Sequence, residues 1–247
     1  MWPSLLDALL LLGAAFGAGA LNAVAGGGSF LTLPALVWTG VPPVVANATG
    51  TVALLPGYVA SVWGQRQDMQ PPPGLGLWAV ALLSLLGGAL GAALLLFTPN
   101  ATFARIVPWL LLLATALFAF GPWLRQWASS AAHADCHGAR WRVGLGLLAV
   151  GVYGGYFNGG LGILLLAFWN LCGGLSLHQM NALKNGVSAL LAAIAVAVYA
   201  AGGVVQWPQA LLMMLAATAG GYVGARLARR IPAQWLRAGI VLTGLVM

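Results

Sequence analysis

The sequence predicts an all-α integral membrane protein, a polytopic helical bundle of two inverted repeats with short helices broken by glycine. The first observation is composition: of 247 residues, 61% are hydrophobic and only 5% are charged, whereas a soluble domain carries about a quarter charged residues. The second is the spacing of the charges, which are absent from Ala8 to Gln65, from Val143 to Leu183 and from Asn185 to Ala225. Windows of this length hold apolar spans of roughly 20 residues each.

The third observation is an internal repeat, because glycines of the first half return 134 positions later together with one asparagine. The matched positions are Gly17, Gly26, Gly28, Gly40 and Asn47 with Gly151, Gly160, Gly162, Gly174 and Asn181. Further on, at an offset of 133, they are Gly87, Gly88, Gly91, Ala92 and Pro99 with Gly220, Gly221, Gly224, Ala225 and Pro232. We therefore expect a transmembrane repeat at residues 1–121, a cytoplasmic loop at 122–140 and a second transmembrane repeat at 141–247.

Each repeat is expected to contain five apolar segments. In repeat one they are Ser4–Ala25, Phe30–Thr39, Val44–Gly64, Leu75–Phe97 and Thr102–Phe120; in repeat two they are Arg142–Phe157, Leu161–Leu171, Leu177–Ala201, Pro208–Leu227 and Trp235–Met247. The second segment of each repeat has only ten or eleven residues, so a helix there reaches roughly half the hydrocarbon thickness. Broken helices in matching places of two repeats are typical of transporter binding sites.

The arginines predict how the chain is oriented in the membrane. Arg66 follows the third segment, Arg140 flanks the connecting loop, and Arg226 lies before the last turn. The positive-inside rule places these regions in the cytoplasm and both termini on the outer side. The corresponding loops of the other repeat, 98–104 and 202–206, carry no charge, as expected for an inverted repeat. Because topology explains the net charge of +7, we expect no nucleic-acid partner.

Polar residues are rare near the two glycine-rich breaks, and those present, with the adjoining glycines, form the candidate substrate-binding set. The set is Asn22, Gly27, Gly28, Ser29, Asn47, Thr51, Asn158, Gly160, Asn181, Lys184 and Asn185. Asn47 and Thr51 are four residues apart and so share one helix face, as do Asn181 and Asn185. The alternative for the polar side chains, the glycines and Ser29 is packing, because small and polar residues commonly hold membrane helices together.

Lys184 is the strongest single indication of a ligand. It lies seven residues into an apolar segment, and a charged side chain at such depth usually marks an ion or substrate path. The chain contains no glutamate, and a carboxylate is available within the spans only if Asp7 reaches Lys184 from the start of the first segment. An unpaired ammonium beside helix N-termini favours an anion. The alternative is that Lys184 extends to the membrane interface.

Two other kinds of site have weaker support. The run from His133 to His137 contains two histidines, an aspartate and a cysteine, but the spacing matches no standard zinc pattern. Ser29 with His178 as its base resembles an intramembrane protease, but the repeat places Ile163 at the position equivalent to the serine. We therefore expect no metal, no cofactor and no enzymatic activity.

The glycine-rich segments also resemble a known family. The motifs are Gly17-Ala18-Gly19, the run from Ala25 to Leu36, the run from Val45 to Thr49, Gly159-Gly160-Leu161-Gly162, the run from Asn181 to Asn185, and the stretch from Gly220 to Pro232. In order and spacing they resemble the TauE/SafE family of sulfite exporters and sulfonate permeases over nearly the whole chain. Repeat two differs from the family pattern in having Ala167-Phe168-Trp169 where a proline is usual.

This resemblance implies a secondary transporter in the bacterial inner membrane that moves a small sulfur-containing anion, such as sulfite, a sulfonate or sulfoacetate. By analogy, alternating access rocks one repeat against the other. Coupling to protons or sodium, the direction of transport and a homodimeric state stay open. An anion channel is the alternative within this class. An intramembrane protease and a membrane assembly factor are the alternatives outside it.

Overall fold

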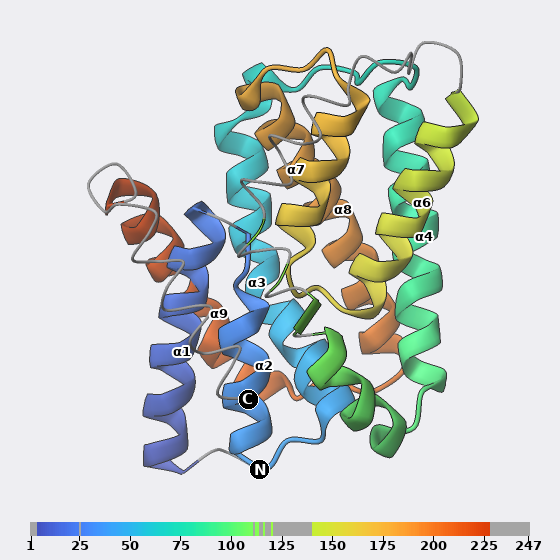
Figure 1. The fold of residues 1–247 in the computed structure, drawn as a ribbon. Helices are drawn as coiled ribbons and strands as arrows, with labels where there is room; N and C mark the ends of the chain where they lie inside the picture. The colour runs from blue at the N-terminus through green and yellow to red at the C-terminus, as the bar shows by residue number, and fades with distance from the viewer. Residues whose placement is uncertain are drawn as a thin grey trace.

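The computed structural model describes residues 4–24, 26–110, 112–113, 116, 120 and 140–227, and these residues form helices and connecting turns (Figure 1). The helices are α1 (Leu5–Val24), α2 (Ser29–Trp38), α3 (Pro43–Gly64), the short η1 (Arg66–Asp68), α4 (Leu77–Phe97), α6 (Arg140–Tyr156), α7 (Leu161–Cys172), α8 (Leu177–Ala201) and α9 (Trp207–Leu227). Residues 100–110 are also helical. The eight predicted segments that fall on α1–α4 and α6–α9 agree with them within two residues, so the all-helical prediction is confirmed. The predicted segment Trp235–Met247 lies outside the described residues.

Four described helices are long and apolar enough to cross a membrane, namely Leu5–Asn22, Pro43–Gly64, Leu77–Phe97 and His178–Ala201. Large apolar side chains cover their outer surfaces, and Leu5 and Trp78, for example, are 80% and 83% exposed. A water-soluble protein rarely exposes apolar surface on this scale, whereas a lipid bilayer accepts it. The chain is an integral membrane protein.

The two glycine-rich breaks meet inside the bundle. Break one (residues 26–28) separates α1 from α2, and break two (residues 157–160) separates α6 from α7. Gly26 and Gly160 have positive φ angles of 82° and 71°, a backbone conformation that glycine adopts without strain. A methyl group at Gly26 would lie 2.9 Å from the Cα of Gly162. Glycine therefore both turns the chain and lets break one contact the first turn of α7, which directly follows break two.

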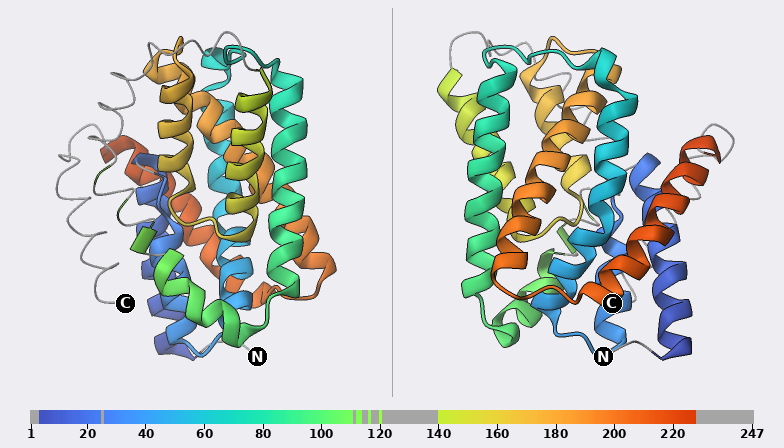
Figure 2. Two further views of the ribbon diagram at one scale, coloured as in Figure 1. Left: turned by 45° about the vertical axis from the view of Figure 1, so that its right-hand side comes forward. Right: turned by 180° about the vertical axis from the view of Figure 1, so that it is seen from behind.

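The helices of the two halves run in opposite directions (Figures 1 and 2). From the breaks, α2 runs toward the lower side in Figure 1 and α7 toward the upper side, and the neighbouring helices α3 and α8 are likewise opposed. The start of α6 lies at the upper side with η1, and a methyl at Gly74 would lie 3.7 Å from Arg140 Cγ. Opposed directions are expected of an inverted repeat, although the symmetry relation itself stays a prediction.

Glycine contacts join the halves through two helix pairs, α1 with α9 and α4 with α6. A methyl at Gly19 would collide with the Ala217 carbonyl, and one at Gly91 would collide with the Val152 carbonyl. Such backbone-to-backbone approach is how small residues pack membrane helices. The first helix of the predicted repeat one is therefore held by a helix of repeat two, and its fourth helix is held by another.

Candidate functional site

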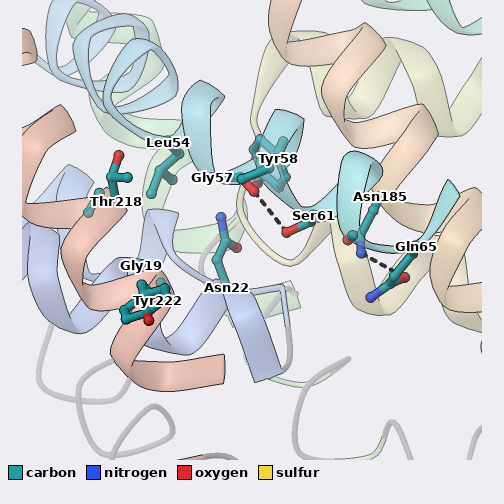
Figure 3. A pocket seen from close by; sticks show the side chains of 14 residues that line it. Gly19, Asn22, Leu54, Gly57, Tyr58, Ser61, Gln65, Asn185, Thr218 and Tyr222 are labelled. Carbon is teal, nitrogen blue, oxygen red and sulfur yellow. Dashed lines mark hydrogen bonds between the residues drawn. The ribbon is translucent and has the colours of Figure 1, made fainter. Parts of the chain in front are cut away.

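A cavity of about 610 Å³ lies between α1, α3, α8 and α9 (Figure 3). Its polar wall consists of Asn22 from α1, of Tyr58, Ser61 and Gln65 from α3 and its end, and of Asn185 from α8. Leucine and alanine side chains and the backbone of glycines supply much of the remaining surface, with Thr218 and Tyr222 on α9. The cavity thus extends from the last turn of α3, at the upper side in Figure 1, to the end of α1 in the interior.

Two of the predicted residues, Asn22 and Asn185, line this cavity. The side-chain oxygen of half-buried Asn22 accepts a hydrogen bond from the Gly28 N–H at 3.1 Å, which satisfies a backbone donor at the start of α2. The Asn185 amide donates to the Gln65 side-chain oxygen at 3.1 Å. Both asparagines are therefore oriented by bonds on one side while they face the cavity on the other.

A third predicted residue, Asn158, lies behind the cavity wall. The Tyr58 hydroxyl donates to Asn158 Oδ1 at 3.5 Å and also interacts with Asn22. Asn158 is 4% exposed, and among the described residues its Nδ2 has no hydrogen-bond partner. One tyrosine therefore connects the asparagines that precede break one and lie within break two.

Lys184 is buried on the second turn of α8, with 4% of its surface exposed, so its side chain does not extend to the surface. Among the residues that the structure describes, the side-chain carboxylates are those of Asp7 and Asp68. The Asp7 carboxylate accepts a hydrogen bond from the Ser4 hydroxyl at 2.6 Å in the first turn of α1, and Asp68 is exposed in η1. In this part of the chain neither carboxylate pairs with Lys184, and a ligand role for Lys184 stays a prediction.

Asn47, Thr51 and Asn181 are placed differently, because the lining of the cavity does not include them. The Asn47 amide donates to the Tyr156 carbonyl at the end of α6, at 3.1 Å. The Thr51 hydroxyl donates to the Asn47 carbonyl within α3, at 2.8 Å. Asn181 is half-buried on α8 and has an interaction of its own. For Asn47 and Thr51 these bonds favour the packing interpretation.

Comparison with known proteins decides the family. The model of the sulfite exporter TauE/SafE family matches residues 11–247. The chain belongs to the TauE/SafE family. It is similar to a "Probable membrane transporter protein" of Haemophilus influenzae, 29% identical over 94% of this chain and 89% of that protein. It is also similar to the "Probable membrane transporter protein YfcA" of Escherichia coli K12, 27% identical over 96% of this chain and 88% of that one. No solved structure gives a significant match.

In this TauE/SafE protein the remaining predicted residues lie at the two breaks. A methyl at Gly28 would lie 2.8 Å from the Ala18 carbonyl, and one at Gly27 would lie 3.0 Å from the Phe30 ring. Ser29 is buried as the first residue of α2, and Gly160 is the residue that precedes α7. Close packing therefore favours glycine at 27, and at 28 a side chain would force the backbone to shift.

The structure does not pair Ser29 with His178. Ser29 is buried at the start of α2, whereas His178 is exposed on the first turn of α8, at the upper side of Figure 1. No group of three or more potential metal ligands occurs among the described residues, and the run from His133 to His137 lies outside them.

Three lining residues, Tyr58, Ser61 and Gln65, are absent from the predicted set. Their spacing of three and four residues places them on one face of α3, inside the charge-free window that ends before Arg66. That stripe of polar atoms is a sequence pattern that would have identified the cavity wall.

Proposed function

We propose that this TauE/SafE protein is a secondary transporter that moves a small sulfur-containing anion, such as sulfite, a sulfonate or sulfoacetate, across the bacterial inner membrane by alternating access. The observation that carries the proposal is a cavity walled by neutral hydrogen-bond donors with no carboxylate among its lining residues. Lys184, the residue before the lining Asn185, is buried, and we propose that its positive charge acts on the anion. Amide and hydroxyl donors next to a cation are suited to an oxyanion.

The sequence set is divided by this proposal. Asn22, Asn158, Lys184 and Asn185 are proposed to act on the anion. Gly27, Gly28, Ser29, Gly160 and Asn181 are proposed to shape the site from the breaks and from α8. Because the Asn47 amide already bonds to the end of α6, we assign Asn47 and Thr51 to holding helices together.

We propose that each moving unit contains helices from both repeats and is not one whole repeat. Residues 1–121 and 141–247 are the two repeats of the proposal, joined by a cytoplasmic loop at 122–140. However, the glycine contacts bind α1 to α9 and α4 to α6, so separating the repeats as rigid bodies would break both pairs. Interfaces that exclude even a methyl group resist sliding. We propose that the α1–α9 pair moves against the α4–α6 pair, and that the cavity between α1, α9 and α3 is the path on the cytoplasmic side.

Binding by the purified protein tests the proposal. Wild-type protein and the Lys184→Met variant are heated with sulfite, sulfoacetate, thiosulfate or sulfate. A ligand present at 100 times its Kd stabilises the folded state by about 2.7 kcal/mol, so the unfolding midpoint of the wild type should rise with at least one anion. The rise should disappear in Lys184→Met.

Arg66→Met is the matched control, because Arg66 is an exposed cation whose Cζ lies 4.6 Å from the centre of the Trp63 ring. This variant should keep the rise of the unfolding midpoint. Counterflow of a labelled anion in proteoliposomes then separates a carrier from a channel, since only a carrier exchanges one anion for another. Absence of a shift with every anion, in a folded wild type, contradicts the proposed substrate class. A normal shift in Lys184→Met removes Lys184 from the site.

A further inference from the structure

Tyr58 occupies a boundary position that no sequence motif had assigned. It lines the cavity from α3 and is only 7% exposed, so its hydroxyl points into the protein rather than to bulk solvent. Its contacts are the Asn22 side chain from α1 and Asn158 Oδ1 from break two. Figure 3 shows the Asn22 side chain entering the cavity from α1 and the Tyr58 side chain entering it from α3. Asn22 and Tyr58 therefore line the cavity, and Asn158 contacts Tyr58 from behind the cavity wall, so that the three polar side chains form one cluster.

Hydrogen-bond donors outnumber free acceptors in this cluster. The Asn22 oxygen is already used by the Gly28 N–H. The Asn158 oxygen is used by the Tyr58 hydroxyl, at a distance of 3.5 Å that is long for an O–H donor, for which about 2.7–2.8 Å is usual. The Asn158 Nδ2 is buried and has no partner among the described residues. Because a buried donor without a partner is costly, the cluster lacks an acceptor.

We propose that the Tyr58 hydroxyl is a direct ligand of the transported anion, and that Asn22 and Asn158 supply amide donors to the same sulfo group. This inference rests on the proposed transport function. A sulfite or sulfonate group presents three acceptor oxygens on one centre, which suits the Asn22 and Asn158 amides and a Tyr58 hydroxyl that turns its proton from Asn158 Oδ1 to the anion. Hydrogen bonds from neutral donors to a charged acceptor are stronger than those between neutral groups. The anion thus accepts the hydrogen bonds of donors that have no acceptor in the cluster.

The location also explains how the anion would act on conformation. Asn22 and Tyr58 belong to the first half of the chain, and Asn158 belongs to the second. A ligand changes the populations of two states only when it binds one of them more tightly. An oxyanion held by donors from both halves is bound tightly only while these donors remain together, so its presence favours the state in which the two breaks are in contact.

A buried water molecule is the competing occupant, since polar groups without partners in protein interiors often bind one. The test is the Tyr58→Phe variant, which removes the hydroxyl and keeps the ring. Its Kd for sulfite and for sulfoacetate, measured by isothermal titration on the purified full chain, should increase about 10- to 100-fold, the loss expected for one hydrogen bond to a charged group.

Tyr153→Phe is the matched control. The Tyr153 hydroxyl donates to the Gly159 carbonyl at 2.7 Å and does not line the cavity, so this variant should lose stability while the folded protein keeps the wild-type Kd. Asn158→Ala is the second variant and should also weaken binding, which keeps the inference testable if Tyr58→Phe does not fold.

The outcomes separate the two proposals. If wild type binds sulfite or sulfoacetate and Tyr58→Phe and Asn158→Ala bind them equally well, water fills the cluster and the inference is overturned, while the transport proposal stands. If Tyr153→Phe loses affinity as much as Tyr58→Phe, the effect comes from general loss of packing, and the inference is overturned in the same way. If the folded wild type binds no anion, the proposed function fails first.

Discussion

The two glycine-rich breaks have similar sequences but are held in different ways. At break two, the Tyr153 and Tyr199 hydroxyls and the Asn47 amide donate to backbone carbonyls at or just before the break. These donors come from α6, α8 and α3. At break one, the described residues show one side-chain bond, from the Gly28 N–H to Asn22, and the cavity lies next to it. Break two is anchored from several helices, whereas break one is bonded to Asn22, which lines the cavity.

This difference indicates that the two breaks have different roles in the protein. Carbonyls exposed by a broken helix at membrane depth need donors, because no lipid can supply them. Break two has protein donors and serves as a rigid support. Asn22, which accepts the hydrogen bond from break one, faces the cavity, and a ligand has room to bind there. Three substitutions test this comparison.

The largest effect is expected from forcing the two breaks apart. Gly26→Ala places a side chain at φ 82° and only 2.9 Å from the Cα of Gly162, so backbone strain adds to a collision that no rotamer relieves. Strain and overpacking each cost about 1–3 kcal/mol, and we expect little folded protein by size-exclusion chromatography. Gly40→Ala is the matched control, since Gly40 has the same φ of 82° with nothing within 4 Å. Equal stability of the two variants would show that the breaks do not touch.

An intermediate effect is expected from removing an anchor of break two. Asn47→Ala leaves the Tyr156 carbonyl without the donor it has at 3.1 Å, which should cost about 1–3 kcal/mol. We expect a lower unfolding midpoint and an unchanged Kd for the anion that wild type binds. A normal midpoint with weakened binding would return Asn47 to the substrate site and contradict the anchoring role.

The smallest effect on stability is expected at break one. Asn22→Asp keeps an oxygen acceptor for the Gly28 N–H, and negative charge is favourable at a helix N-terminus. The free energy of unfolding should therefore stay within about 1 kcal/mol of the wild-type value. The added charge faces the cavity and should weaken anion binding at least tenfold, because like charges across a binding surface repel strongly. Titration of the same anion into Asn22→Asp and wild type checks this, and equal affinities would show that Asn22 does not contact the anion.

The sequence predicted the helices well because the chain marks their ends with proline, glycine and arginine between charge-free windows. The sequence did not show which helices pack against each other. Small residues at Gly19 and Gly91 indicate a face that packs closely, but they do not say that α9 fits the first and α6 the second. The pattern of a packing face is the same for any partner.

For the site, the sequence identified Asn22, Asn158 and Asn185, which the structure places in or behind the cavity wall. The sequence placed Asn47 on one helix face with Thr51, and both residues lie on α3. It could not show that the Asn47 amide donates to the Tyr156 carbonyl, because that bond depends on where α6 ends. Tyr58 was missed because a tyrosine in an apolar helix is usually read as a packing or interfacial residue. The role of its hydroxyl follows from the cavity and from the positions of Asn22 and Asn158, which the sequence alone does not give.

The pairing of α1 with α9 has a consequence for how the chain matures during synthesis. α1 leaves the ribosome before the other described helices, yet the backbone that fits against Gly19 belongs to α9, the last of them. α4 and α6, in contrast, lie close together in the sequence. Contacts between distant segments form late, so the nascent chain must keep its first helix in the bilayer without a tight partner until nearly all the described helices have been inserted. A ribosome that stalls before α9 would release a chain with a bare glycine-lined face, which membrane quality-control proteases could recognise.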